Sequence, residues 1–295
     1  MNKPYPIVFS DLDNCLLDRD DYGFAAATEA LKALRRHGIP LILVSSKTRR
    51  EMEAVRLLLD LDTPFIAESG AALYIPRDFA GLGELPPGGD GRYALIEWGL
   101  PYAAIRQALV EAARTFAVRG FGDMEPAEVA ALTGLHLTQA SLAAAREYTE
   151  PFLLEEPARL LPLIAWAAER GLQVLAGGRF HHLAAAAQDK GRAVTFLCER
   201  FRRHAGGPVI TMALGDSPND LPMLAAVDMP VLLPDASGGY ADLHLPKAIR
   251  ASEPSSRGWN RQVLAFLRIV GLEASSPGQL SPFTPDTPST RKEAP

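Results

Sequence analysis

The first seventy-five residues alternate between short apolar runs and stretches with helical spacing. Continuous apolar runs are typical of parallel strands buried on both faces, and they predict strands at residues 7–9, 39–44, 65–67 and 73–75. Between the first two runs, residues 24–34 place apolar side chains three or four positions apart, which predicts a helix. Thr48 and Glu51 have the spacing of a capping box, which predicts the start of a second helix.

The same alternation returns near the other end of the chain. Residues 209–214 and 230–233 are predicted strands, and residues 217–226 form a predicted helix between them. Strands and helices that alternate in this way favour a parallel sheet with helices on both faces. We therefore expect an α/β protein with a Rossmann-like core.

The region between these two parts has a different pattern of apolar, proline and glycine residues. It begins with a break rich in proline and glycine at residues 86–91. The pattern then predicts strands at 93–98, 152–154 and 172–175 and helices at 101–116, 126–132, 142–147 and 160–170. We interpret residues 85–185 as a smaller α+β domain inserted into a core of residues 1–84 and 186–273. Residues 274–295 are rich in serine, proline and threonine and are expected to form a disordered tail.

Composition and charge exclude several classes of partner. The chain of 295 residues is 47% hydrophobic, as is usual for a globular protein, and its net charge of −5 gives no basic footprint for nucleic acid. Two cysteines are too few for a disulfide framework, and no apolar run approaches the roughly 20 residues that span a bilayer. The first residues lack a signal-peptide pattern. We expect a cytoplasmic protein without a nucleic-acid or membrane partner.

Two pairs of carboxylates follow predicted strands of the core. Asp11 and Asp13 come directly after the first strand, and Asp216 and Asp220 follow the strand at residues 209–214. Open α/β sheets bind ligands at the carboxyl ends of their strands, where such side chains could share a divalent cation. Taken alone, each pair is also compatible with turn formation or helix capping.

Two further segments offer groups that suit an anion. Ser45 and Ser46 follow the second strand beside a predicted helix start, and Lys190 stands at the beginning of another helix. Helix capping also explains a polar cluster after a strand, and a lone lysine is more often a surface residue. The order of carboxylate pair, hydroxyl, lysine and second carboxylate pair favours one functional site over four unrelated structural explanations.

This order of motifs carries a specific resemblance. Asp11-x-Asp13, Ser45, Lys190 and Gly215-Asp216-Ser-x-x-Asp220 resemble the four motifs of haloacid dehalogenase-type phosphatases. The inserted domain resembles the cap of the sugar-phosphatase branch. Five strings are similar to those of mannosyl-3-phosphoglycerate phosphatases: Ser46-Lys47-Thr48-Arg49, residues 64–70, 145–148 and 177–181, and Asp189-Lys190-Gly191. The chain departs from the usual Gly-Thr at Asn14-Cys15 and from the usual Glu-Asn-Gly at Glu68-Ser69-Gly70.

The resemblance implies a mechanism and a cofactor. Asp11 would be the nucleophile and Asp13 the general acid and base. Mg²⁺ would be bound by the Asp11 carboxylate, the backbone carbonyl of Asp13 and the Asp216 carboxylate, with Asp220 in support. The residues implied to contact the phosphoryl group are Ser45, Ser46 and Lys190.

Substrate choice is expected to depend on the inserted domain. The candidates there are Arg179, which follows two glycines and could bind a carboxylate, and His181. Glu68 is a further candidate for substrate binding, in the core. The resemblance implies a small phosphorylated sugar–glycerate substrate, mannosyl-3-phosphoglycerate first, with glucosyl-3-phosphoglycerate or another sugar phosphate as alternatives. A non-catalytic binding protein and a phosphotransferase or mutase are the competing classes. A loop arginine and unpaired histidines also have simpler explanations as solvated residues.

Overall fold

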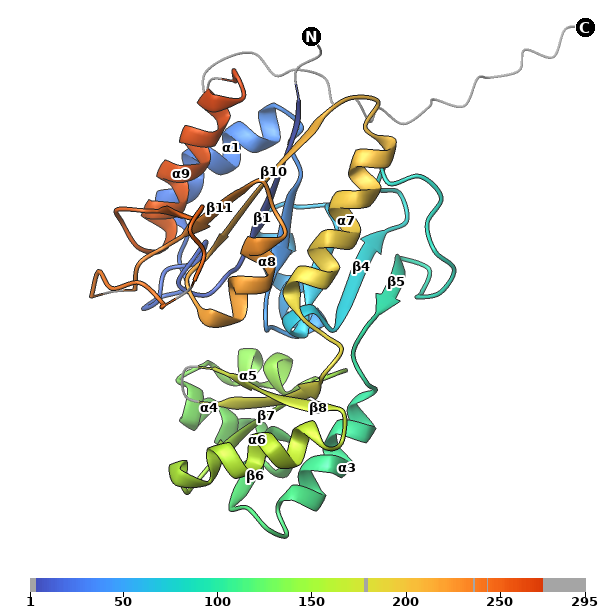
Figure 1. Ribbon diagram of the computed structural model, residues 1–295, viewed down its shortest axis with the longest axis vertical. Helices are drawn as coiled ribbons and strands as arrows, with labels where there is room; N and C mark the ends of the chain where they lie inside the picture. The colour runs from blue at the N-terminus through green and yellow to red at the C-terminus, as the bar shows by residue number, and fades with distance from the viewer. Residues whose placement is uncertain (1–3, 178–179, 236, 243, 273–295) are drawn as a thin grey trace, which may run out of the picture.

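A computed structural model describes residues 4–177, 180–235, 237–242 and 244–272 (Figure 1). The larger of its two domains is built on an eight-stranded sheet of order β12-β11-β10-β1-β2-β3-β4-β5. The strands are Tyr5–Ser10 (β1), Leu41–Val44 (β2), Phe65–Ala67 (β3), Ala72–Pro76 (β4), Tyr93–Glu97 (β5), Val209–Gly215 (β10), Met229–Leu232 (β11) and Ile249–Arg250 (β12).

Most neighbouring strands of this sheet are parallel, as the alternation of elements predicted. β4 is the exception, because it runs antiparallel to both β3 and β5. The connection between β3 and β4 is a short turn at residues 68–71, which is too short for the crossover that parallel strands need. β5 also corrects the expected domain boundary: it pairs with β4 along its whole length instead of beginning the inserted domain.

Helices cover both faces of the large sheet. Helices α1 (Thr28–Arg36), α2 (Arg49–Leu58) and α9 (Ser255–Ile269) pack on one face, and α7 (Lys190–His204) and α8 (Leu221–Ala225) pack on the other. Successive residues of β1 point to opposite faces, so Val8 joins the first cluster while Ile7 and Phe9 join the second. Burial on both faces explains why these strands read as continuous apolar runs.

The smaller domain, which we call the cap, extends from α3 to β9. It has a four-stranded antiparallel sheet of order β6-β7-β9-β8. Its strands are Val118–Gly120 (β6), Glu150–Leu154 (β7), Leu172–Ala176 (β8) and His181–Ala185 (β9). Its helices are Tyr102–Ala112 (α3), Pro126–Thr133 (α4), Leu137–Ala144 (α5) and Leu160–Ala168 (α6). The α3 and α6 helices cover the face away from the core, and α4 and α5 lie on the side toward it (Figure 1).

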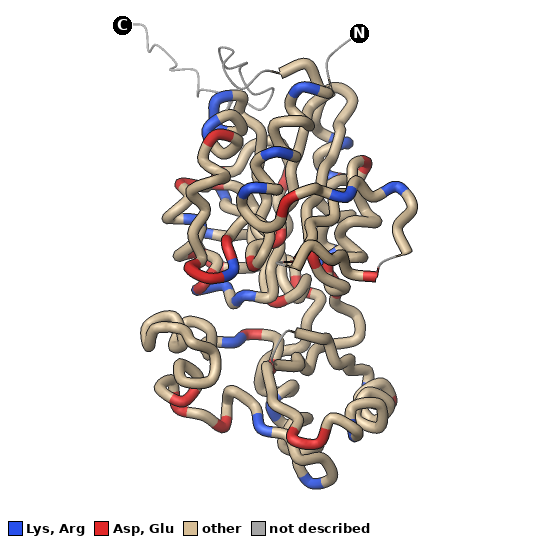
Figure 2. Tube along the Cα trace, turned by 90° about the vertical axis from the view of Figure 1, so that its left-hand side faces the viewer, with Lys and Arg blue, Asp and Glu red and all other residues tan. Residues whose placement is uncertain are grey.

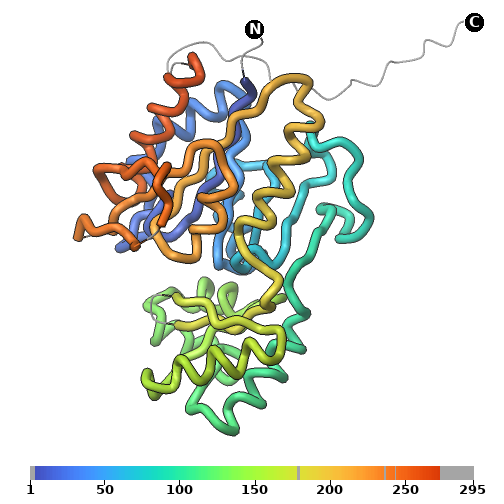
Figure 3. The backbone as a smooth tube through the Cα atoms, in the orientation of Figure 1, coloured from blue at the N-terminus to red at the C-terminus, as the bar shows by residue number. Residues whose placement is uncertain are grey.

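The chain passes between the two domains twice, after β5 and before α7 (Figure 3). One prediction near this boundary is wrong: α5 ends at Ala144, so Arg146 and Glu147 lie beyond it instead of inside a helix at residues 142–147. The backbone N–H groups of residues 147–149 donate to the Glu68 side chain, which satisfies them outside any helix.

Among the described residues, the structure has no helix of the length and apolar character that crossing a membrane requires. The predicted tail at residues 274–295 lies outside the described residues.

Candidate active site

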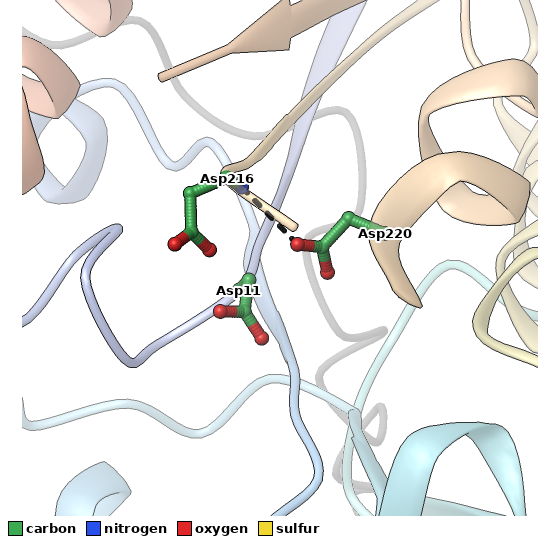
Figure 4. A group of neighbouring side chains, drawn as sticks. All are labelled: Asp11, Asp216 and Asp220. Carbon is green, nitrogen blue, oxygen red and sulfur yellow. Dashed lines mark hydrogen bonds between the residues drawn. The ribbon is translucent and has the colours of Figure 1, made fainter. Parts of the chain in front are cut away.

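Three carboxylates meet at the carboxyl ends of β1 and β10. These strands are parallel neighbours in which Ser10 pairs with Leu214, so Asp11 and Asp216 leave the sheet at the same edge. Asp220 ends the short 3₁₀ turn that follows and points back toward them (Figure 4). Carboxylate oxygens of Asp11, Asp216 and Asp220 all lie within 4.8 Å of one another. The structure therefore brings Asp11 of the first predicted motif together with Asp216 and Asp220 of the fourth, and Asp13 is not a member of this group.

Lys190 joins this group from the first position of α7. Its Nζ donates to Asp11 Oδ1 and to Asp220 Oδ1, at 2.6 Å in each case, and its side chain is 4% exposed. The other oxygen of Asp220 accepts hydrogen bonds from the backbone N–H groups of Asp216 and Ser217 and from the Ser217 hydroxyl. Both oxygens of Asp220 are thus engaged. Asp220 holds the Lys190 ammonium and the turn at residues 216–220 in place. Asp11 and Asp216 are therefore the carboxylates of this group that have oxygens available to bind a metal ion.

The site carries more negative charge than its lysine compensates. Burial raises the pKa of Asp11 well above its usual value, against the opposing effect of Lys190, and the Asp220 and Asp216 charges raise it further. Burial, followed by the Asp220 charge, raises the pKa of Asp216 to about 7. Two buried carboxylates and one partly buried carboxylate beside one ammonium call for an added cation. Their oxygen donors are those that Mg²⁺ prefers, so the residues present fit this ion.

The loop after Asp11 turns sharply and places Asp13 at a cavity. Asn14 has a φ of 56°, in the left-handed region that asparagine tolerates, so the departure from glycine preserves the turn. Asp13 forms an ion pair with Lys47, whose Nζ lies 2.8 Å from Asp13 Oδ1. Although burial opposes the charge, Asp13 and Glu51 raise the pKa of Lys47, which keeps it protonated.

Helix α9 supports the backbone at Asp11 through a buried hydrogen-bond chain. Trp259 of α9 is fully buried and donates from Nε1 to the Ser10 hydroxyl at 2.9 Å. The same hydroxyl donates to the backbone carbonyl of Asp11 at 2.6 Å. Neither Trp259 nor a role for Lys47 was predicted from the sequence. The family-like string at residues 46–49 pointed to Lys47. No sequence pattern pointed to Trp259, whose partner Ser10 lies 249 residues away in the chain.

The second motif lies at the same edge of the sheet. Ser45 follows β2, is buried, and its hydroxyl accepts from the backbone N–H of Lys47. The carbonyl of Ser46 accepts a hydrogen bond of 2.8 Å from Arg146 Nη1 of the cap connection. The parallel pairing of β1 and β2 places both serines at the same end of the sheet as Asp11, and Ser46 also contacts the segment that leads into the cap sheet.

Glu68 follows β3 in the core and contacts the segment that connects the cap. Its buried carboxylate accepts from the backbone N–H groups of Glu147, Tyr148 and Thr149 and from the Thr149 hydroxyl, at 2.8, 3.2, 2.7 and 2.6 Å. Arg146 adds a charge at 4.0 Å. These donors occupy the carboxylate and attach the cap connection to the core, and a role for Glu68 in substrate binding stays a prediction.

The turn that carries Glu68 also contacts the helix of Lys190. Glu68, Ser69 and Gly70 have successive φ values of 48°, 58° and 90°, all in the left-handed region. A Cβ at Gly70 would lie 2.1 Å from the carbonyl oxygen of Asp189, so this close approach requires glycine. Gln188 donates to the carbonyl of Glu68 at 2.9 Å. One turn thus links the cap connection to the start of α7.

The two cap histidines lie on opposite faces of the cap sheet. His181 shares the face of Phe152, beneath α3 and α6, and its ring contacts that phenylalanine. His182 lies on the face toward the core, where burial, followed by the Arg146 charge, lowers its pKa to about 3. His182 is therefore the histidine of this pair directed toward the domain boundary, and a role for His181 in substrate binding stays a prediction. Arg179 lies outside the described residues.

A cavity of about 390 Å³ opens where the cap meets the loop of Asp13. The residues that line it are Asp13, Asn14, Asp18, Arg19, Tyr22, Thr133 and Phe180. Figure 2 shows acidic and basic residues along the edge of the core that faces the cap. The cavity has room for a small polar ligand whose reacting end would lie beside Asp13.

Comparisons with known proteins agree with this arrangement. Residues 8–80 match the family of haloacid dehalogenase-like hydrolases. Glucosyl-3-phosphoglycerate/mannosyl-3-phosphoglycerate phosphatases from Persephonella marina and Methanococcoides burtonii are 39% and 40% identical to this chain. The alignments cover 90% and 88% of this chain and 98% and 97% of the relatives.

Solved structures share the fold at low sequence identity. A sucrose-phosphatase from Synechocystis, solved with sucrose and phosphate, is 16% identical with a TM-score of 0.59 over 91% of this chain and 98% of that one. A Thermoplasma acidophilum protein is 16% identical with a TM-score of 0.64 over 91% of this chain and 99% of that one. From its sequence relatives, the chain belongs to the haloacid dehalogenase-like hydrolases, and it is a phosphatase.

Proposed function

We propose that this phosphatase is Mg²⁺-dependent, forms an aspartyl-phosphate, and hydrolyses glycosyl-3-phosphoglycerates, with mannosyl- and glucosyl-3-phosphoglycerate as its substrates. The observation that carries the chemistry is the mostly buried cluster of Asp11, Asp216, Asp220 and Lys190. The substrate follows from relatives about 40% identical over nearly their whole length, whose printed names give both sugars.

The chemistry divides into two steps. A carboxylate oxygen of Asp11 attacks phosphorus, and the bond from phosphorus to the leaving oxygen breaks as Asp13 gives that oxygen a proton. Asp13 then takes a proton from water, which attacks phosphorus and returns the Asp11 carboxylate together with inorganic phosphate. Lys190, already in contact with Asp11, donates to the transferring oxygens together with Ser45.

The metal would be bound by the carboxylates of Asp11 and Asp216 and by the backbone carbonyl of Asp13, with Asp220 in support. When bound, Mg²⁺ supplies positive charge that offsets repulsion between the carboxylate nucleophile and a phosphate dianion.

The cap supports selectivity for the part of the substrate that does not react. The cavity beside Asp13 has walls from both domains, so a ligand there contacts the cap through Thr133 and Phe180. Arg179 remains our proposal for a cap residue that binds an anionic group of the substrate, and His181 remains a weaker proposal. A binding protein without turnover would not need Asp13, which makes that alternative the less favoured one.

Phosphate release with Mg²⁺ tests this proposal directly. The substrates are mannosyl-3-phosphoglycerate, glucosyl-3-phosphoglycerate, sucrose phosphate and simple hexose phosphates, each with wild type and with the Asp11→Asn variant as a control for contaminating phosphatase. Higher kcat/KM for both glycosyl-3-phosphoglycerates is expected. Preference for a hexose phosphate would contradict the proposed substrate, and equal rates for wild type and Asp11→Asn would contradict the mechanism.

A further inference from the structure

A partly buried lysine lies against the residue proposed as general acid. Lys47 Nζ is 2.8 Å from Asp13 Oδ1, and its side chain is only 14% exposed. The ammonium also lies over the Tyr22 ring, 5.3 Å from its centroid. The proposed mechanism gives this lysine no task, although it brings a full positive charge next to the leaving group.

Lys47 stands between two cavities at the domain boundary. Asp13 and Tyr22 line the cavity of about 390 Å³. Lys47 and Tyr22 line a second cavity of about 280 Å³, whose walls include residues of α2 and α5. The ammonium is therefore within reach of a ligand that enters beside Asp13, without any need to cross the protein.

The chemistry of a 3-phosphoglycerate places its carboxylate near this ammonium. The oxygen that leaves phosphorus must lie at Asp13, which protonates it. The carboxylate carbon of glycerate is two carbon–carbon bonds from the carbon that bears this oxygen. A cation that already touches Asp13 is thus within reach of the substrate carboxylate.

We propose that Lys47 binds the carboxylate of the leaving glycerate, exchanging its Asp13 partner for the substrate. This inference rests on the proposed substrate. The exchange replaces the Lys47–Asp13 contact with an equivalent charge-assisted contact to the substrate carboxylate, so it costs a carboxylated substrate little binding free energy. A phosphate ester without a carboxylate offers Lys47 no new partner, and the enzyme discriminates between the two at this residue.

Other described cations near the site are less suited to this task. Lys190 is held by Asp11 and Asp220. Arg146 donates to the carbonyl of Ser46 and lies 4.0 Å from Glu68. Arg19 lines the cavity but is exposed, so salt and water screen its charge.

The test compares substrates that differ only in the carboxylate. The pair is glucosyl-3-phosphoglycerate and the matching glucosylglycerol phosphate, in which the carboxylate is replaced by a hydroxymethyl group. Wild type should prefer the first substrate. Lys47→Met should lower kcat/KM for this substrate about 10- to 100-fold more than for the second, and Lys47→Arg should restore part of the preference.

A binding measurement separates recognition from catalysis. Calorimetry with Mg²⁺ and the inactive Asp11→Asn variant should show tighter binding of 3-phosphoglycerate than of glycerol 3-phosphate. The added substitution Lys47→Met should remove this difference, whereas Arg179→Ala should leave part of it.

The outcomes distinguish the inference from the proposed function. If wild type has no preference for the carboxylated substrate, the proposed substrate is wrong and the inference with it. If wild type prefers it and Lys47→Met keeps that preference, only the role of Lys47 is wrong. Equal losses on both substrates would make Lys47 a residue that orients Asp13. Loss of the preference in Arg179→Ala alone would assign carboxylate recognition to the cap.

Discussion

Removal of the Glu68 carboxylate should detach the cap from the core more than any surface change. In the folded protein this side chain is 1% exposed and accepts four hydrogen bonds from residues 147–149. Glu68→Ala leaves three backbone N–H groups and one hydroxyl without their acceptor in a buried place. Bonds to a charged acceptor are each worth about 1.5–3 kcal/mol, and these four share one carboxylate and are not additive. We expect a loss of about 3–5 kcal/mol in the free energy of unfolding.

Glu68→Gln should have a smaller effect for a geometric reason. Oε2 accepts three of the four bonds and Oε1 accepts the bond from the Glu147 N–H. A glutamine can direct its carbonyl oxygen at the three donors, but its NH₂ group then faces the N–H of Glu147. We expect one lost bond and a destabilisation of about 1–3 kcal/mol.

Two measurements check this reasoning. Urea unfolding gives the stability, and hydrogen exchange of the amides of Glu147, Tyr148 and Thr149 gives the local effect, because these amides should exchange faster in Glu68→Ala. Glu111→Ala is the matched control, since Glu111 forms an exposed cap ion pair with Arg170 and should cost less than about 1 kcal/mol. The reasoning is refuted if Glu68→Ala matches this control in stability and its three amides keep their protection.

The remaining predictions concern the reacting groups and the metal. Asp11→Asn should lower kcat more than 100-fold, about 2.7 kcal/mol or more, with an unchanged circular dichroism spectrum; a smaller loss in phosphate release would exclude Asp11 as nucleophile. EDTA should stop turnover and Mg²⁺ restore it, and full activity in EDTA would remove the metal from the mechanism. Because a cation competes with the proton on Asp216, whose pKa is raised to about 7, the apparent Mg²⁺ affinity in calorimetry should fall about tenfold per pH unit below 7; a flat profile from pH 5 to 8 would contradict this. Because the pKa of Asp216 is higher in the folded protein than in the unfolded chain, the folded state binds this proton more tightly. The free energy of unfolding of the metal-free protein should therefore fall as pH rises from about 4 through 7, and thermal unfolding can follow this trend. Trp259→Phe should keep the core filled but lose the bond to Ser10, with a drop of about 0.5–1.5 kcal/mol in stability and a fall in kcat; unchanged kcat would show that this contact does not position Asp11.

The acidic cluster could be anticipated from the sequence because local rules place each of its members. Asp11 and Asp216 each follow a strand that has a clear apolar pattern, and parallel neighbours end at one edge of the sheet. Thr48 was likewise predictable, since a capping box needs only residues three positions apart, and the structure contains it. Predictions of this kind depend on spacing within one or two elements.

The contacts at the domain boundary could not be anticipated in this way. Glu68 meets its partners about 80 residues later in the chain, at a segment whose spacing suggested a helix. The signal at residues 86–91 was interpreted as a domain break, yet it belongs to the connection between β4 and β5. Asp90 there accepts from the backbone N–H groups of Arg92 and Tyr93, which forms a tight turn before β5. A proline- and glycine-rich loop and a domain boundary have the same local composition, so only the pairing of β5 separates them.

The same distinction explains why the motifs of this chain define its chemistry better than its substrate. The proposed phosphoryl site depends on side chains at the ends of regular elements, because Asp11 and Asp216 follow β1 and β10 and Lys190 begins α7. The cavity beside Asp13 depends instead on the loop that carries Tyr22 and on Thr133 and Phe180 of the cap. These side chains meet because the Glu68 carboxylate and the turn at residues 68–70 hold the cap connection and the start of α7 together. We therefore expect substrate selectivity to depend on the position of the cap relative to the core, which the contacts of Glu68 help to fix.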